Sequence, residues 1–143
     1  MVFMEIKKTN TALISGIRAF FRSSGKKKAV LGLSGGVDSS LVSSLLAEAL
    51  GPKNVTGLIL PLRGTSSASS IKDAQVVAEA LGVNAHKKDI YGIVKSFSTT
   101  GWKQGKTAKS NTIARIRAVL LYNYANSNDC LVAGTGNRTE LTL

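Results

Sequence analysis

A buried strand, a glycine-rich turn and a helix follow one another near the start of the chain, and this order constrains the fold more than any other feature. Residues 28–33 form a short apolar run typical of a buried strand. The turn at residues 34–39 has the sequence Ser-Gly-Gly-Val-Asp-Ser, and residues 37–50 carry leucine and alanine at helical spacing. A strand that leads through a tight turn into a helix predicts a βαβ unit with parallel strands.

Strand and helix patterns alternate along the rest of the chain. Further strands are expected at residues 55–60, 83–90 and 129–133, and further helices at residues 9–24, 71–81, 91–97 and 111–125. This alternation predicts an α/β fold, a three-layer α/β/α sandwich around a parallel sheet. Because no internal repeat or interdomain linker is evident, we expect residues 1–143 to form a single domain with its ligands at the carboxyl ends of the strands.

Two segments lack a clear periodic pattern. Residues 98–110 contain glycine, serine, threonine and lysine without periodicity, so we expect a mobile loop there. Residues 65–70 are small and polar and form another loop, from which Ser69 or Ser70 could cap the helix at 71–81.

The turn at residues 34–39 has the chemistry of a phosphate site. Its glycines let the backbone approach an anion closely, and the start of the following helix adds a favourable dipole. Ser34 and Ser39 offer hydroxyl donors. Asp38 would repel a phosphate unless Mg²⁺ bridged the two, since Mg²⁺ is usually held by carboxylates together with phosphate oxygens. No lysine follows Gly36, so the turn is not the P-loop that grips a terminal phosphate.

The motif Ser-Gly-Gly-x-Asp-Ser after a strand resembles that of the PP-loop ATP pyrophosphatases, which have the adenine nucleotide alpha hydrolase-like fold. Within that superfamily, residues 111–117, 121–122, 125–126 and 131–141 are similar to ammonia-dependent NAD synthetase, and the resemblance is collinear from near Ala12 to the last residue. The resemblance implies that ATP adenylylates the nicotinate carboxylate of deamido-NAD. Ammonia then displaces AMP to give NAD.

The resemblance also implies roles for individual residues. Asp38 and Glu140 would hold Mg²⁺, and Arg115 would contact deamido-NAD. The contacts to ATP, the co-substrate, would come from Gly32, Leu33, Ser34, Gly35, Gly36, Val37, Asp38, Ser39 and Thr135. No protein nucleophile is required, because cations and positioning can offset the repulsion between a carboxylate and a triphosphate.

Several of these residues also have a simpler interpretation. Glu140 could be an ordinary acid in the first turn of a helix, Thr135 could serve a turn, and Arg115 could be a surface arginine. Arg117 lies about 200° around the helix from Arg115, so the two arginines are not expected to face one ligand. Arg63 follows a strand and could either reach a phosphate or remain a solvated loop charge.

Composition narrows the partners and the location. The net charge of +11 favours polyanionic ligands, but the basic residues are scattered and no aromatic run interleaves them, so nucleic-acid binding is not expected. No apolar run approaches the roughly 20 residues that cross a membrane. The single cysteine, Cys130, suits a reducing compartment, and a cytoplasmic protein is expected. The resemblance adds a homodimer that acts on ATP, deamido-NAD and ammonia.

Members of the resembled family continue well beyond the position that matches Leu143, with further contacts to both substrates. We therefore expect the chain to be the N-terminal part of the ATP-binding domain, to lack the C-terminal part, and to form little NAD alone. Two alternatives stay open: another PP-loop adenylylating enzyme, either GMP synthetase-like or tRNA-modifying, and a non-catalytic ATP-binding module.

Overall fold

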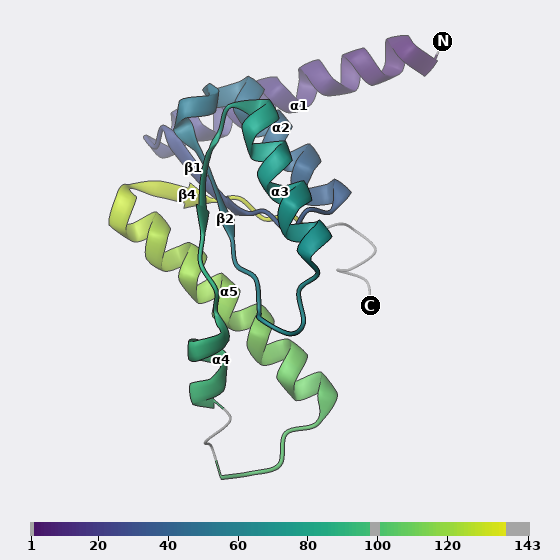
Figure 1. Ribbon diagram of the computed structural model, residues 1–143. Coiled ribbons are helices and arrows are strands. Elements are labelled where there is room, and N and C mark those ends of the chain that lie inside the picture. The colour runs from purple at the N-terminus through teal and green to yellow at the C-terminus, as the bar shows by residue number, and fades with distance from the viewer. Residues whose placement is uncertain (1, 98–100, 137–143) are drawn as a thin grey trace.

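The computed structural model describes residues 2–97 and 101–136, and these residues build a parallel sheet of four strands in the order β3-β2-β1-β4 (Figure 1). The strands are β1 (Lys28–Gly32), β2 (Val55–Ile59), β3 (Asn84–Lys87) and β4 (Cys130–Val132). The helices of the described residues are α1 (Val2–Ser24), α2 (Val37–Leu50), α3 (Ala68–Leu81), α4 (Tyr91–Phe97) and α5 (Lys106–Asn128), with a 3-10 turn, η1, at Pro52–Asn54.

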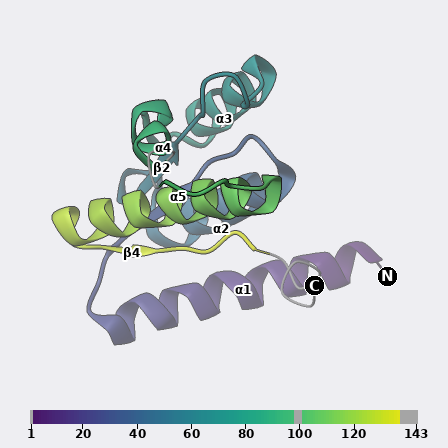
Figure 2. The same cartoon turned by 90° about the horizontal axis from the view of Figure 1, so that it is seen from below.

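Helices cover both faces of the sheet, because successive side chains of a strand point to opposite faces. Ala29 and Leu31 of β1 pack in the core shared with α1, α2 and α3, whereas Val30 packs in a second core with α5. Figure 2 shows α1 and α5 as separate layers with β4 between them. The predicted three-layer α/β/α sandwich with a parallel sheet is therefore confirmed.

The register of the strands aligns three of their carboxyl ends. Gly32 at the end of β1 pairs with Leu58 of β2, and Val30 pairs with Val132 at the end of β4. The segments that follow β1, β2 and β4 consequently leave the sheet at the same edge.

Three helices are longer than the sequence pattern predicted. α1 begins at Val2 instead of residue 9, and α5 begins at Lys106 instead of residue 111 and ends at Asn128 instead of residue 125. The expected loop at 98–110 is therefore wrong for residues 106–110. α3 begins at Ala68 instead of residue 71, so the expected loop at 65–70 is wrong for residues 68–70. The side chains of residues 3–9 and 106–110 are exposed, so no core contact imposes the apolar periodicity on which the prediction relied.

The cap of α3 is also different from the prediction. Ser67, not Ser69 or Ser70, is the N-cap residue, and its Oγ accepts a hydrogen bond of 3.1 Å from the backbone N–H of Ser70. The helix ends as expected at Gly82, which adopts a left-handed conformation with φ of 67°.

β3 is shorter than the predicted strand at 83–90 and lies at an edge of the sheet. All four of its side chains are exposed, which agrees with the polar sequence there. Pairing with β2 continues past its end, since the N–H groups of Lys88 and Ile90 donate to the carbonyl oxygens of Ile59 and Pro61.

One side of α1 carries exposed apolar side chains. Ile6, Leu13 and Phe20 are seven residues apart and therefore lie almost in a line along the helix; we call them the α1 stripe. They are 59 %, 48 % and 62 % exposed. The N-terminal end of α1 extends beyond the other helices in both views (Figures 1 and 2). None of the described helices is both long and apolar enough to cross a membrane.

Candidate functional site

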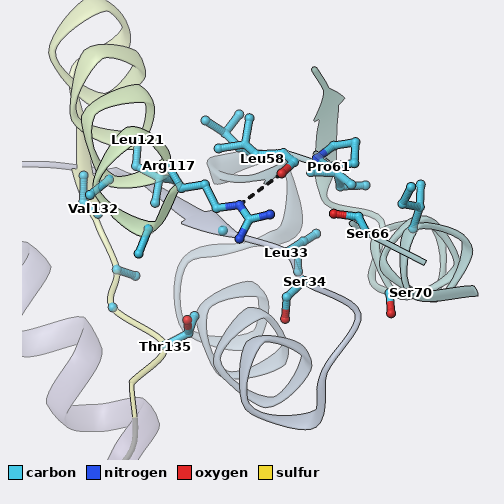
Figure 3. Close-up of a pocket in the computed structure, with 18 of the residues that line it drawn as sticks. Leu33, Ser34, Leu58, Pro61, Ser66, Ser70, Arg117, Leu121, Val132 and Thr135 are labelled. Atoms are coloured by element: carbon cyan, nitrogen blue, oxygen red, sulfur yellow. Dashed lines mark hydrogen bonds between the residues drawn. The ribbon is translucent and has the colours of Figure 1, made fainter. Parts of the chain in front are cut away.

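A cavity of about 780 Å³ lies at the carboxyl ends of β1, β2 and β4 (Figure 3). Its lining comes from the start of the turn after β1, most of the segment between β2 and α3, the first turn of α3, one face of α5 and residues 132–135. This is the edge at which parallel α/β sheets bind their ligands, and it is the edge predicted from the sequence.

The turn after β1 requires glycine at residue 35. Gly35 has φ of +83°, and a Cβ atom built there would lie 2.3 Å from the backbone oxygen of Ser70 at the start of α3. At residue 35 the turn after β1 lies so close to the start of α3 that no side chain fits between them.

Two serines hold the shape of this turn. Ser39 is 2 % exposed, and its Oγ donates to the carbonyl oxygen of Gly36 at 3.0 Å and accepts from the N–H of Ser34 at 3.3 Å. Ser34 Oγ in turn accepts from the N–H of Gly36 at 3.2 Å. Ser34 lines the cavity, whereas the Ser39 hydroxyl is engaged inside the turn.

Leu33 also lines the cavity. Its side chain fills the space beside Gly57 of the neighbouring strand β2, where a larger residue would place its own side chain. A Cβ atom at Gly57 of β2 would lie 2.2 Å from Leu33 Cδ1. Leu33 is 3 % exposed and belongs to the main core. The close packing of the turn against β2 therefore requires glycine at residue 57.

The turn continues into the N-terminus of α2. Gly36 is the N-cap residue, and no side chain makes a capping hydrogen bond there in the described part of the chain. The backbone N–H groups of a first helical turn lack intrahelical partners and favour an anion, as does the helix dipole. Asp38 lies in this first turn and is half-buried.

The structure brings together some of the predicted site residues. Gly32, Leu33, Ser34 and Thr135 line the cavity, and they come from the end of β1 and from the segments that follow β1 and β4, two neighbouring strands. The predicted contacts Gly35 to Ser39 form the rest of the turn and the start of α2, outside the cavity lining. Glu140 lies outside the described residues.

The predicted arginine and an overlooked arginine point in different directions. Arg115 is exposed, lies outside the cavity lining, and donates from Nη1 to the carbonyl oxygen of Asn111 on its own helix at 3.3 Å. Arg117 lines the cavity and donates from Nε to the carbonyl oxygen of Leu60 at 3.1 Å. The wide angle between the two arginines was predicted, but the cavity-facing residue was not identified.

A sequence signal for Arg117 did exist. Ala114, Ala118 and Leu121 of α5 also line the cavity. Ala114 lies three residues before Arg117 and Leu121 four residues after it, and Ala118 lies four residues after Ala114. Residues with this spacing share one face of a helix. The small side chains on that face leave room for a ligand beside the arginine.

Arg63 is engaged with other residues. Its Nη2 lies 2.9 Å from Asp89 Oδ2, and its guanidinium lies 5.5 Å from the ring centre of Tyr91. The backbone N–H of Tyr91 and the Arg63 guanidinium together hold the pKa of Asp89 below its ordinary value. Of the two interpretations of Arg63, the structure favours a solvated loop charge, because its side chain is 77 % exposed and pairs with Asp89 at the surface.

The side chains at the turn suit Mg²⁺ only if the ion is also bound by the phosphates of a nucleotide. The described residues contain no group of three or more His, Cys, Asp or Glu side chains that could hold a metal. Mg²⁺ bound to a nucleotide takes only one or two carboxylates from a protein, with phosphate oxygens and water completing its shell. Asp38, beside the phosphate-like site, is suited to that mode.

Comparison with known proteins gives a consistent result. The family model described as NAD synthase matches residues 9–143. The NH(3)-dependent NAD(+) synthetase of Archaeoglobus fulgidus is 43 % identical over 138 residues, which are 96 % of this chain and 56 % of that protein. The corresponding protein of Hyperthermus butylicus is 44 % identical over 128 residues, 89 % of this chain and 46 % of its own length. The chain thus spans about half the length of the curated relatives it matches.

Solved structures show the same similarity in three dimensions. The NH3-dependent NAD synthetase of Campylobacter jejuni superposes with a TM-score of 0.88 at 32 % identity, over 94 % of this chain and 58 % of that one. An NMN synthetase from Francisella tularensis gives 0.86 at 30 % identity, over 94 % of this chain and 56 % of that one.

Proposed function

Because the chain belongs to the NAD synthase family, we propose that it is the ATP-binding part of an ammonia-dependent NAD synthetase. In the proposed reaction, a carboxylate oxygen of deamido-NAD attacks the α-phosphorus of ATP and releases pyrophosphate. Ammonia then attacks the adenylylated carbonyl, loses a proton and expels AMP, which leaves the amide of NAD. The support comes from relatives named for this activity that are about 40 % identical over most of the chain.

The cavity at the carboxyl ends of β1, β2 and β4 is the observation that carries the proposal. The turn after β1 and the N-terminus of α2 supply backbone N–H groups for the phosphates, and Ser34 and Thr135 add hydroxyl donors in the cavity. The proposed role of these groups is to hold the triphosphate in position and to stabilise negative charge, which is the main contribution that a protein makes to phosphate chemistry.

Mg²⁺ is part of the proposal, with Asp38 and Glu140 as its protein ligands. When bound, the cation would offset the negative charge of the phosphates beside the attacking carboxylate. Asp38 is supported by its place in the first turn of α2. For Glu140 the support is the family resemblance alone.

The second substrate is proposed to contact Arg115. This side chain is exposed and lies outside the cavity, so its partner would be a part of deamido-NAD that extends beyond the ATP site. We also propose that two copies of the chain associate, for which the exposed α1 stripe is the support. A cytoplasmic location is proposed from the single free cysteine and from the nucleotide substrates.

The first test is ATP binding with and without Mg²⁺, measured by titration calorimetry on the wild-type chain and on Asp38→Asn. We expect Mg²⁺ to strengthen binding by on the order of tenfold, and we expect Asp38→Asn to remove most of this gain. Asp73→Asn, an exposed aspartate on α3, is the matched control and should keep the gain. Equal losses with and without Mg²⁺ would refute the metal role of Asp38, and a wild-type chain that does not bind ATP would refute the proposed function.

A second test follows the products. Release of AMP and pyrophosphate would be measured with ammonia, ATP and either deamido-NAD or its mononucleotide counterpart. Turnover with the mononucleotide alone would redirect the proposal toward the activity named for the Francisella protein. Tight ATP binding with no product from any substrate, in the presence of the remaining half of a relative, would favour a non-catalytic module. A steeply salt-dependent affinity for tRNA would favour a tRNA-modifying relative.

A further inference from the structure

Arg117 is the only residue with a charged side chain among the residues that line the 780 Å³ cavity, all of which belong to the described part of the chain. The remaining lining is apolar or carries uncharged hydroxyl groups, such as those of Ser34, Ser66 and Thr135. The one charged side chain in this lining is therefore a cation, which favours an anionic ligand.

The arginine is held in place from one side only. Its Nε donates to the carbonyl oxygen of Leu60, which follows β2, at 3.1 Å. Figure 3 shows the side chain reaching from α5 into the cavity, with its two terminal nitrogens turned toward the interior. One hydrogen bond therefore orients the guanidinium plane, while the Nη1 and Nη2 donors point into the cavity.

No carboxylate of the described residues forms a salt bridge with Arg117. The ion pairs in which both partners are described residues are Lys26–Asp129 and Arg63–Asp89. Arg117 is half-buried, and this burial lowers its pKa, although an arginine stays charged at any ordinary pH. A half-buried cation without a counter-ion is costly, and an incoming anion would remove that cost.

We propose that Arg117 recognises the phosphate groups of the nucleotide by a forked contact from Nη1 and Nη2. This inference rests on the proposed function, since it assigns one residue of the ATP site. The cavity reaches Arg117 from Ser34 at the phosphate-binding turn, so a nucleotide held by that turn lies in the same space as the guanidinium. Forked donors of this kind match phosphate oxygens better than a lysine ammonium does.

A structural role for Arg117 makes a different prediction. If the arginine only braced Leu60, its loss would weaken the binding of every ligand of the cavity and would lower the melting temperature. If it recognises phosphate, the loss would depend on the number of phosphates that the ligand carries.

The test compares adenosine, AMP and ATP without Mg²⁺ at fixed ionic strength, on wild type, Arg117→Gln and Arg117→Lys. We expect Arg117→Gln to bind adenosine like wild type but AMP and ATP about tenfold more weakly. Arg117→Lys, which keeps the charge without the fork, should fall between the two. Arg22→Gln, on the exposed side of α1, removes the same charge far from the cavity and should change none of these affinities.

Each outcome separates this inference from the proposed function. Wild-type affinity for ATP in Arg117→Gln would overturn the role of Arg117 while the proposed function stood. Equal losses for adenosine and ATP, with a lower melting temperature, would show a structural brace and would also overturn it. If the wild type bound no nucleotide, the proposed function would fail. Inorganic pyrophosphate would then be the probe, and equal pyrophosphate binding by wild type and Arg117→Gln would refute the phosphate contact.

Discussion

Gly35 combines a left-handed backbone conformation with close contact to another segment. Its φ is +83°, and a Cβ atom would lie 2.3 Å from the backbone oxygen of Ser70. Gly64 has nearly the same φ, +84°, but nothing lies within 4 Å of the position of its Cβ atom. The two glycines therefore separate the cost of the backbone conformation from the cost of the contact.

Gly64→Ala should lower the free energy of unfolding by about 1–2 kcal/mol, the cost of the left-handed conformation alone. Gly35→Ala should lower it by a further 1–3 kcal/mol, because backbone atoms of the turn and of α3 must move apart. Urea unfolding measures both values, and ATP binding should be weakened only in Gly35→Ala. Equal destabilisation by the two substitutions would contradict the close contact.

At the residue scale, the sequence predicted which kinds of residue the site needs better than it predicted which residues they contact. The need for glycine in the turn followed from the motif, but the contact of Gly35 with Ser70 did not, because the two residues meet only when α2 and α3 pack on one sheet. Arg115 was selected by resemblance, whereas Arg117 faces the cavity because α5 turns Ala114 and Leu121 the same way. Glu140 remains a prediction.

At the scale of elements, the carboxylate of Asp89 links the start of α4 to the segment that follows β2. Asp89 Oδ1 accepts the N–H of Tyr91 at 3.0 Å, and Oδ2 accepts Arg63 Nη2 at 2.9 Å. The hydrogen bond from Tyr91, followed by the interaction with Arg63, lowers the pKa of Asp89 from its ordinary value of 3.8. A carboxyl group with a lowered pKa in the folded state stabilises that state above its ordinary pKa, and the contribution is lost as the pH falls through the lowered value.

Asp89→Asn should therefore be less stable than wild type at neutral pH, and the difference should shrink as the pH falls below 3.8. Thermal unfolding monitored by circular dichroism over pH 2–7 would measure it, a range chosen to span roughly the titration of carboxyl groups. Asp73→Asn on α3 is the control. A constant difference between Asp89→Asn and wild type across that range would contradict the pKa argument.

Burial alone does not explain which elements were predicted with the correct bounds, because α2 has buried residues and α4 has none. α2 and α4 have the predicted bounds, Val37–Leu50 and Tyr91–Phe97. The first turns of α1 and α5 were missed because their side chains are exposed and make no core contact. The cap of α3 was misplaced by two residues or more because several serines in succession offer the same hydroxyl chemistry.

At the scale of the whole molecule, the alternation of strands and helices predicted the layers but not the strand order. The order β3-β2-β1-β4 places β1 between β2 and β4, and this arrangement brings the segments after three strands into one cavity. It also leaves α1 on the outside of its layer, with the stripe of Ile6, Leu13 and Phe20 exposed.

If the α1 stripe forms the proposed interface between two copies, Leu13→Glu should convert a dimer to a monomer. The introduced charges would be buried without partners in the interface. Sedimentation velocity over a concentration series measures the oligomeric state. Val76→Glu, which alters an exposed valine on α3, should remain dimeric. A wild-type chain that stays monomeric at every concentration would refute the homodimer.

The contact between Leu33 and Gly57 has a consequence for how this sequence can evolve. Leu33 Cδ1 lies 2.2 Å from the place of a Cβ atom at residue 57, so the two positions share one volume. A lineage that acquires a side chain on β2 at residue 57 must first accept a smaller residue at 33, or it passes through a strained intermediate. Substitutions at the two sites should thus occur together among descendants of this protein, and the size of one residue should restrict which residues are tolerated at the other.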